Sequence, residues 1–239
     1  MKVLVTGPFG NVGKHTVDEL INQGHQVKCF ATDRKPNRKA AKEYGGQIET
    51  VWGDVRFPAD VAKAVQDQEA VVHLAYVIPS TTSTRGISSE DRPEWAWEVN
   101  VKGTKNVVDA AMALPNPPRL IFASSTDIFG RTQDKEPPRT ATDPVVATSH
   151  YSYQKIQCEE MVRASGLDWA ILRFCAVPPI KLKLDPTGFD IPWDNRVEFV
   201  HPRDAGLACA NAVACEKVSG KILLIGGGQR CQLYWGDFA

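Results

Sequence analysis

The sequence has no excess charge of either sign. Its 239 residues include 28 acidic and 28 basic side chains, so no net field attracts nucleic acid or an anionic membrane surface. No apolar run approaches the roughly 18 residues of a membrane span, and strand-like residues begin at Lys2, which leaves no room for a signal peptide. We therefore expect a soluble, cytoplasmic protein whose partners are small molecules and include neither nucleic acid nor membrane.

Metal-binding and disulfide patterns are also lacking. The six cysteines show no CxxC spacing and no Cys/His arrangement typical of metal ligands. We expect reduced, mostly buried thiols and assign neither a disulfide nor a metal site. The cysteines are Cys29, Cys158, Cys175, Cys209, Cys215 and Cys231.

Strand-like and helix-like stretches alternate along the chain, which has 43% apolar residues and can bury a large core. Apolar, β-branched runs predict strands at 2–6, 26–31, 48–52, 70–75, 120–124, 169–174 and 221–225. Helical periodicity predicts helices at 12–23, 35–44, 59–66, 93–113, 148–165 and 202–216. Continuously apolar strands are typical of a sheet covered on both faces. The predicted fold class is therefore α/β, with a doubly wound, parallel, Rossmann-like sheet.

The stretch GPFGNVG lies between the first predicted strand and the first predicted helix. Gly7 would permit the tight turn, Gly10 would let the backbone approach a pyrophosphate, and Gly13 would let the helix pack closely on the sheet. The alternative is a glycine-rich turn without a ligand, but a complete βαβ context favours dinucleotide binding. The candidate cofactor-binding residues here are Gly7, Phe9, Gly10, Asn11, Val12 and Gly13.

The GxxGxxG spacing resembles the short-chain dehydrogenase/reductase superfamily, in particular its extended branch of nucleotide-sugar epimerases and dehydratases. GDV at 53–55, HLA at 73–75 and NVKGT at 100–104 are similar to further motifs of that branch, in the same order. The resemblance implies that Asp54 touches the adenine ring, with Val55 beside it. It also implies that the segment after the fourth strand lines the cofactor, with Leu74, Ala75 and Tyr76 as candidates.

The choice between NAD and NADP stays open at this point. An acidic residue about 20 positions beyond the glycines would accept both ribose hydroxyls and repel a 2′-phosphate. Asp33 is a candidate, although a gapless comparison with the family puts the acidic position at Ala31. Arg34 and Lys35 could instead grip a 2′-phosphate, or all three charges could be solvated. We lean slightly to NAD.

Tyr151 and Lys155 are four residues apart and lie on one face of a predicted helix. A phenol with a pKa of about 10 is a poor base, and a neighbouring ammonium favours its ionised form. By resemblance, this YxxxK supplies the acid/base Tyr151 and a Lys155 that also holds the nicotinamide ribose. Without the family, such a pair is also common on helix surfaces. Tyr153 has Gln157 at the same spacing and does not qualify.

The third catalytic candidate comes from the end of the fifth predicted strand. Matching FG at 129–130 to the family's YG places the catalytic hydroxyl at Ser125, which would orient the substrate oxygen; a backbone-satisfying serine is the alternative. Thr126 and Asp127, two further candidates for substrate contact, then stand where sugar 4,6-dehydratases of the family have Asp-Glu. The loss of the acid argues against elimination, although Asp127 could still act on a substrate proton. Asn100 could complete a proton relay or serve helix packing.

Later segments resemble the family less closely. ILRFCAVPP matches at Arg173, while Ala176 replaces an expected Asn, and RVEFVHPRDAG resembles a further signature. Arg196, Trp193 and Phe189 are guesses for a small substrate pocket. His73 and His201 are assigned no catalytic role.

The expected organisation is a dinucleotide-binding Rossmann domain with the catalytic helix at 1–174. Residues 175–239 would form a small, reduced substrate-side region that adds the last strand or strands to the same domain. Residues 178–195 lack periodicity and are expected to form an irregular substrate-side loop.

The predicted function is that of an NAD(P)-dependent oxidoreductase or epimerase-like enzyme acting at a secondary alcohol or ketone carbon of a sugar-like or other small substrate. The alternative is a catalytically silent NAD(P)-binding sensor or scaffold of the same fold. The resemblance implies a homodimer through the helices that carry Asn100 and Tyr151.

Overall fold

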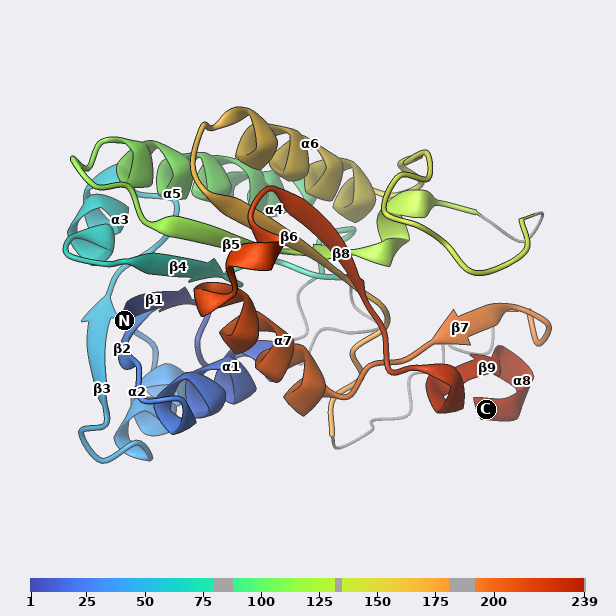
Figure 1. Ribbon diagram of the computed structural model, residues 1–239, viewed down its shortest axis with the longest axis horizontal. Helices are drawn as coiled ribbons and strands as arrows, with labels where there is room; N and C mark the ends of the chain where they lie inside the picture. The colour runs from blue at the N-terminus through green and yellow to red at the C-terminus, as the bar shows by residue number, and fades with distance from the viewer. Residues whose placement is uncertain (80–87, 132–134, 181–191, 239) are drawn as a thin grey trace.

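A computed structural model of the chain describes residues 1–79, 88–131, 135–180 and 192–238. A seven-stranded parallel sheet forms its centre, in the order β3-β2-β1-β4-β5-β6-β8 (Figure 1). The strands are β1 Lys2–Thr6, β2 Gln26–Ala31, β3 Ile48–Trp52, β4 Ala70–His73, β5 Arg119–Ser125, β6 Trp169–Phe174 and β8 Lys221–Ile225. The predicted α/β class is confirmed. The strand order reverses direction between β1 and β4, which makes a crevice at the carboxyl ends of these two strands.

Helices cover both faces of the sheet (Figure 1). One face carries α1 Asn11–Asn22, α2 Lys35–Lys42 and α7 Pro202–Ala214. The other face carries α3 Pro58–Val65, α5 Gly103–Met112 and α6 His150–Ala164. Shorter elements are α4 Pro93–Trp97, the π-helix η2 Glu98–Lys102, the 3₁₀ helices η3 Thr126–Phe129, η5 Glu216–Val218 and η6 Gln229–Cys231, and α8 Trp235–Phe238.

Two apolar cores lie on the two faces because side chains alternate along each strand. In β1, Val3 and Val5 join the core under α1 and α7, whereas Leu4 joins the core under α3, α5 and α6. All three side chains are fully buried, and each contributes about 1.5–3 kcal/mol relative to an exposed position. This two-sided burial explains why the strands appear as continuous apolar runs.

Two predicted elements differ from the structure. The strand predicted at 70–75 ends at His73, because the amides of Leu74 and Ala75 turn to the Thr6 hydroxyl, both at 3.1 Å. The helix predicted at 93–113 is interrupted by the π-turn η2. Side-chain periodicity does not report such a local change in backbone winding.

The segment after residue 174 contributes to two sheets. Strand β8 pairs with β6 in the main sheet. Strands β7 Arg196–Glu198 and β9 Gln232–Tyr234 form a separate antiparallel pair. The division of the chain at residue 174 stays a prediction. Within the described ranges, no helix is both long and apolar enough to cross a membrane.

Candidate active site

The glycine turn joins β1 to α1 at the crevice. Gly7 has φ +66°, and a Cβ there would lie 2.9 Å from the backbone of Leu74 and Ala75. A Cβ on Gly13 would lie 2.2 Å from the Gly7 carbonyl oxygen, so only glycine lets α1 start this close to the turn. Gly10 is the N-cap of α1, which begins without a side-chain cap and without an acidic residue in its first turn. Its backbone amides therefore suit an anionic ligand.

The side chains around these glycines face the protein. Asn11 donates to the carbonyl oxygens of Val177 at 3.1 Å and Pro178 at 3.4 Å. Phe9 packs near Tyr44, with ring centres 6.5 Å apart, and Val12 packs against the core under α1. Any role of these residues toward a ligand would therefore lie mainly in their backbone.

An open pocket of about 410 Å³ lies at the carboxyl ends of β2 and β3, lined by Thr32, Asp33, Arg34, Trp52, Gly53, Asp54 and Asp60. The Asp33 carboxylate forms a bidentate ion pair with the Arg38 guanidinium of α2. Asp54 pairs with Arg56 at 2.7 Å. Burial acts to raise the pKa of Asp54, but the Arg56 hydrogen bonds outweigh it, so the pKa is lowered. Both carboxylates are therefore charged where they line the pocket.

Val55 and His73 are buried in the core. Val55 is 6% exposed, and a Cβ on Gly103 of α5 would lie 2.8 Å from it. His73 is 1% exposed, and its ring nitrogens bond the Thr6 hydroxyl at 2.7 Å and the Thr104 hydroxyl at 3.1 Å. Burial lowers the pKa of His73 to about 3, so it stays neutral and links β1, β4 and α5.

Ser125, Tyr151 and Lys155 come together where β5 ends against α6. Ser125 is the last residue of β5; its hydroxyl accepts from the Asp127 amide at 3.1 Å and lies near the Tyr151 phenol. Lys155 lies one turn further along α6, with Nζ 5.7 Å from the centre of the Tyr151 ring. Helix α6 starts with a capping box in which the side chains of Ser149 and Ser152 each accept from the other's backbone amide. This box fixes the turn that carries Tyr151.

Burial controls the protonation of this cluster. Lys155 is 3% exposed and donates to the Ala123 carbonyl oxygen at 2.6 Å. Burial lowers the pKa of Lys155 to about 7. Burial also raises the pKa of Tyr151, although the nearby Ser125 hydroxyl acts to lower it. The protein alone thus favours a neutral phenol, and added positive charge at the site would favour the phenolate.

Two carboxylates approach the start of α6. Glu90, 60 residues away in sequence, accepts from the backbone amide of His150 at 3.2 Å, and from that of Tyr151 at 3.1 Å. Asp127 accepts from the Ser149 hydroxyl at 3.4 Å. Burial, with a smaller contribution from Glu90, raises the pKa of Asp127. Sequence reasoning missed Glu90, because no motif marks it and the contact exists only in the folded chain.

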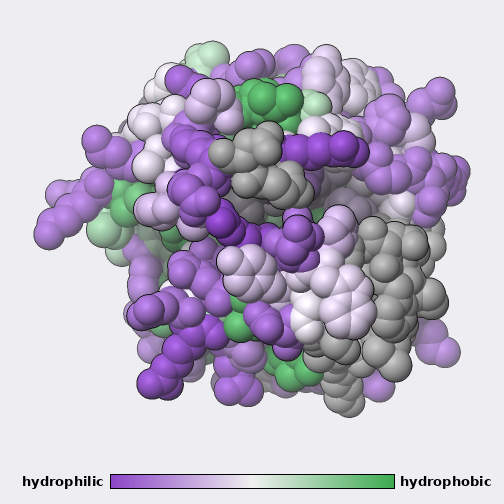
Figure 2. Space-filling model, turned by 90° about the vertical axis from the view of Figure 1, so that its right-hand side faces the viewer, coloured by the Kyte–Doolittle hydropathy of each residue, from purple (hydrophilic) through white to green (hydrophobic). Residues whose placement is uncertain are grey.

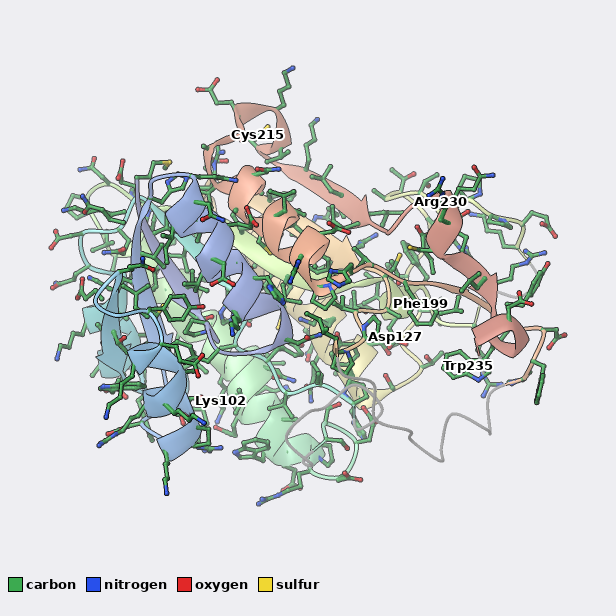
Figure 3. The ribbon with its side chains drawn as sticks, turned by 90° about the horizontal axis from the view of Figure 1, so that it is seen from below. Lys102, Asp127, Phe199, Cys215, Arg230 and Trp235 are labelled. Carbon is green, nitrogen blue, oxygen red and sulfur yellow. The ribbon has the colours of Figure 1, made fainter. Side chains whose placement is uncertain are left out.

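The carboxyl side of the sheet is the side shown in Figure 2, where polar side chains dominate and pale aromatic and green apolar groups are interspersed. Asp127 lies on the same side of the molecule as Phe199 and Trp235 (Figure 3). Thr126 follows Ser125, and its hydroxyl acts to lower the pKa of the nearby Cys175 thiol, which burial raises. The β7–β9 pair lies on the same side of the molecule as the end of β5 (Figure 1).

Two of the residues guessed for a substrate pocket, Arg196 and Trp193, have exposed side chains. Arg196 is exposed and pairs with Glu136 at 3.1 Å. Trp193 is 67% exposed, and Phe189 lies outside the described residues. Arg173 is buried and held by Glu159 at 2.7 Å, which ties β6 to α6.

Asn100 lies in η2 and is fully buried. Its side-chain oxygen accepts from the Val77 amide at 2.7 Å, and its side-chain nitrogen donates to the Val77 carbonyl at 3.0 Å and to Gln154 at 2.7 Å. Its backbone carbonyl accepts from Thr104 at 2.5 Å and from Cys158 at 3.4 Å. These contacts favour the packing role over the relay.

Replacing Asn100 by Ala is expected to lower the free energy of unfolding by about 1–3 kcal/mol, because it leaves buried groups of Val77 and Gln154 without partners. Urea unfolding followed by circular dichroism measures this loss. Asn106→Ala is the matched control, since Asn106 makes one hydrogen bond, to the Val55 carbonyl. An Asn100→Ala protein as stable as the control would contradict the packing role.

The order of the strands, the glycine turn at the reversal and the Tyr–Lys pair beside β5 define a protein of the extended short-chain dehydrogenase/reductase class. The sequence model of the NAD dependent epimerase/dehydratase family matches residues 3–178. The chain belongs to this family.

Similar proteins include enzymes with different substrates. A 3-beta-hydroxysteroid dehydrogenase of Mycolicibacterium neoaurum is 33% identical over 133 residues, which cover 56% of this chain and 34% of the relative. UDP-glucose 4-epimerase 2 of Arabidopsis thaliana is 28% identical over 182 residues, which cover 71% of this chain and 49% of the relative. The chain thus spans about half or less of the length of these relatives.

Solved structures show the same fold. UDP-glucose 4-epimerase of Thermus thermophilus in complex with NAD has a TM-score of 0.79 and 22% identity, and the match covers 99% of this chain and 80% of that one. DesIV from Streptomyces venezuelae, a dTDP-glucose 4,6-dehydratase, has a TM-score of 0.82 and 24% identity, with 100% and 79% covered.

Proposed function

We propose that this chain is an NAD(P)-dependent oxidoreductase or epimerase-like enzyme acting at a secondary alcohol or ketone carbon of a sugar-like or other small substrate. The observation that carries the proposal is the meeting of Ser125, Tyr151 and Lys155 at the carboxyl end of β5. That end lies next to the β1/β4 crevice, because β5 is the neighbour of β4 in the sheet. Family membership and the activities of the relatives support the same reaction class.

The residues present fit an adenine dinucleotide along the carboxyl edge of the sheet. The cradle at Gly7 and Gly10, with the uncapped amides of α1, suits a diphosphate. The pocket beside Asp33 and Asp54 suits an adenosine. A nicotinamide ring would supply the hydride acceptor or donor and, when oxidised, a positive charge.

The protein's own residues would handle the proton. Ser125 orients the substrate oxygen by a hydrogen bond, and Tyr151 removes the hydroxyl proton as the carbon loses its hydride. The ammonium of Lys155 stabilises the phenolate form of Tyr151. Return of the hydride to the same face reverses the oxidation, and return to the opposite face gives an epimer. The same residues therefore serve both reactions.

The test combines binding with turnover. Calorimetry on the folded chain is expected to detect uptake of NAD or NADP, and a screen of sugar nucleotides, free sugars and hydroxysteroids is expected to show cofactor reduction or epimer formation. Folded protein that takes up neither nucleotide would contradict the proposal. The homodimer also stays a prediction.

We propose NAD as the preferred cofactor. The lining of the adenosine pocket includes three carboxylates, those of Asp33, Asp54 and Asp60, and one guanidinium, that of Arg34. Arg38 and Arg56 balance the charges of Asp33 and Asp54, so the preference for NAD rests on the position of Asp33, whose carboxylate can accept both ribose hydroxyls and repel a 2′-phosphate. The solved structures of the Thermus thermophilus epimerase and of DesIV both contain NAD, which supports this choice.

Asp33→Asn is expected to weaken NAD binding about tenfold and to raise the relative affinity for NADP, because a charged hydrogen-bond acceptor is lost and repulsion of a 2′-phosphate falls. Calorimetric titration with both nucleotides measures the ratio. Arg38→Gln is the control, since it breaks the pair with Asp33 and keeps the carboxylate. An Asp33→Asn protein with an unchanged NAD/NADP ratio would exclude Asp33 as the selecting residue.

A second candidate function is a dinucleotide-binding sensor without chemistry. The observation that favours it is the protonation state of the cluster, because burial acts against both the ammonium of Lys155 and the phenolate of Tyr151. Tight nucleotide uptake with no turnover in the substrate screen would support this candidate.

A further inference from the structure

The aromatic ring of Tyr76 covers the ammonium of Lys155. The Lys155 Nζ lies 3.3 Å from the centre of the Tyr76 ring, closer than to the rings of Phe122 at 4.9 Å and Tyr151 at 5.7 Å. The same Tyr76 ring meets the Tyr151 ring edge to face, with centres 5.8 Å apart. Tyr76 therefore contacts both members of the Tyr151–Lys155 pair.

The backbone of Tyr76 is held from two sides. The preceding residue, Ala75, donates its amide to Thr6 at 3.1 Å, and the following residue, Val77, is bonded at both its amide and its carbonyl by Asn100. The Tyr76 hydroxyl lies 3.9 Å from the Cys158 sulfur on α6. The ring is thus fixed between the end of β4 and α6.

We propose that Tyr76 is a positioning residue that keeps the ammonium of Lys155 charged and aimed at Tyr151 through its π face. The catalytic consequence of this inference rests on the proposed function, whereas the contact between Tyr76 and Lys155 does not depend on that function. It assigns Tyr76 a role in the proton-transfer site in addition to the cofactor lining expected from the sequence.

The charged and titratable groups around Lys155 leave the stabilisation of its ammonium to the Tyr76 ring. On α6, Cys158 and Glu159 act to raise the pKa of Lys155, but Glu159 is engaged by Arg173 and the pKa of Cys158 is raised by burial, which keeps the thiol neutral. On β4, His73 is a buried neutral group. On β5, the Ala123 carbonyl accepts from the ammonium at 2.6 Å, and the Phe122 ring lies further away than the Tyr76 ring, at 4.9 Å.

A cation over an aromatic face is stabilised by the ring quadrupole, most strongly where water is excluded. Phenylalanine retains this face, whereas leucine and methionine fill similar space without it. Burial lowers the pKa of Lys155 to about 7, so loss of the ring would lower it further while the site stays dry. This direction distinguishes the π contact from mere filling of space.

The closing experiment measures the Lys155 pKa directly, by NMR titration of protein with isotope-labelled lysine side chains. Lys155→Arg assigns the signal. We expect Tyr76→Leu and Tyr76→Met to lower this pKa by about one unit, and Tyr76→Phe to leave it unchanged. Two apolar variants are used so that failure of one to fold leaves the other. A Lys155 pKa that is the same in the apolar variants, or that falls equally in Tyr76→Phe, would overturn the proposal.

Turnover adds a second readout. In the active arrangement Tyr151 is a phenolate and Lys155 an ammonium. An inactive arrangement, with a Tyr151 phenol and a Lys155 free amine, holds the same number of protons. A lower Lys155 pKa therefore shifts the balance toward the inactive arrangement. Plateau turnover is expected to fall about tenfold per unit of lost pKa, and the pH at which turnover rises is expected to move down. If the apolar variants shift the Lys155 pKa but the unmodified protein turns over no substrate, the result would support the Tyr76 contact and count against the proposed function.

Discussion

Replacing Tyr151 by Phe is expected to reduce turnover about 10³-fold, because the variant keeps the ring and loses the only proton-transferring atom of the residue. The ring contact with Tyr76, at 5.8 Å between centres, does not involve the hydroxyl and is retained. Binding of the dinucleotide and the unfolding temperature should therefore change little. Steady-state kinetics, calorimetry and thermal melts together measure the three quantities.

Tyr153→Phe is the matched control for this substitution. Tyr153 lies on the same helix but is 53% exposed, and its hydroxyl contacts Gln157 at 3.4 Å. It should keep the activity of the unmodified protein. If Tyr151→Phe retained full turnover of every accepted alcohol, Tyr151 would not be the acid/base.

Replacing Gly10 by Ala is expected to weaken dinucleotide binding at least about tenfold while the fold stays intact. Gly10 has φ −80°, which alanine adopts readily, and a Cβ there would contact just the Gly7 carbonyl oxygen, at 3.4 Å. The added methyl group would instead occupy the space in which a diphosphate approaches the amides of α1. Calorimetric titration measures the affinity, and circular dichroism checks the fold.

Gly13→Ala separates folding from binding in the same turn. A Cβ on Gly13 would lie 2.2 Å from the Gly7 carbonyl oxygen, so the backbone must shift. We expect a stability loss of at least about 1–3 kcal/mol by urea unfolding. Gly10→Ala protein that bound the dinucleotide as tightly as the unmodified chain would show that the diphosphate does not rest on this turn.

Much of the fold and part of the site could be predicted because they depend on local patterns. The apolar runs at 2–6, 26–31 and 169–174 are all central strands with both faces covered. Tyr151 and Lys155 share one face of α6 because helical spacing alone brings them together. In the glycine turn, the close contact at Gly13 is local, with the Gly7 carbonyl oxygen, whereas the close contact at Gly7 is with Leu74 and Ala75 at the end of β4.

Other parts of the site depend on segments that are distant in sequence. The Glu90 contact with the start of α6 and the Asn100 clamp on Val77 join residues 23 to 61 positions apart. No periodicity marks such pairs. The position of the Tyr76 ring on Lys155 likewise follows from the early end of β4 at His73, which the apolar run to residue 75 conceals.

By itself, then, the chain's order of residues determined the alternating strands and helices, the glycine turn and the face that presents Tyr151 with Lys155, because these depend on side-chain periodicity and short-range backbone geometry. Only the packed structure decided which groups surround that pair, how burial sets the pKa of Lys155, and which carboxylates reach the start of α6. The physical reason is that burial and long-range hydrogen bonds arise when segments from separate strands meet at one edge of the sheet.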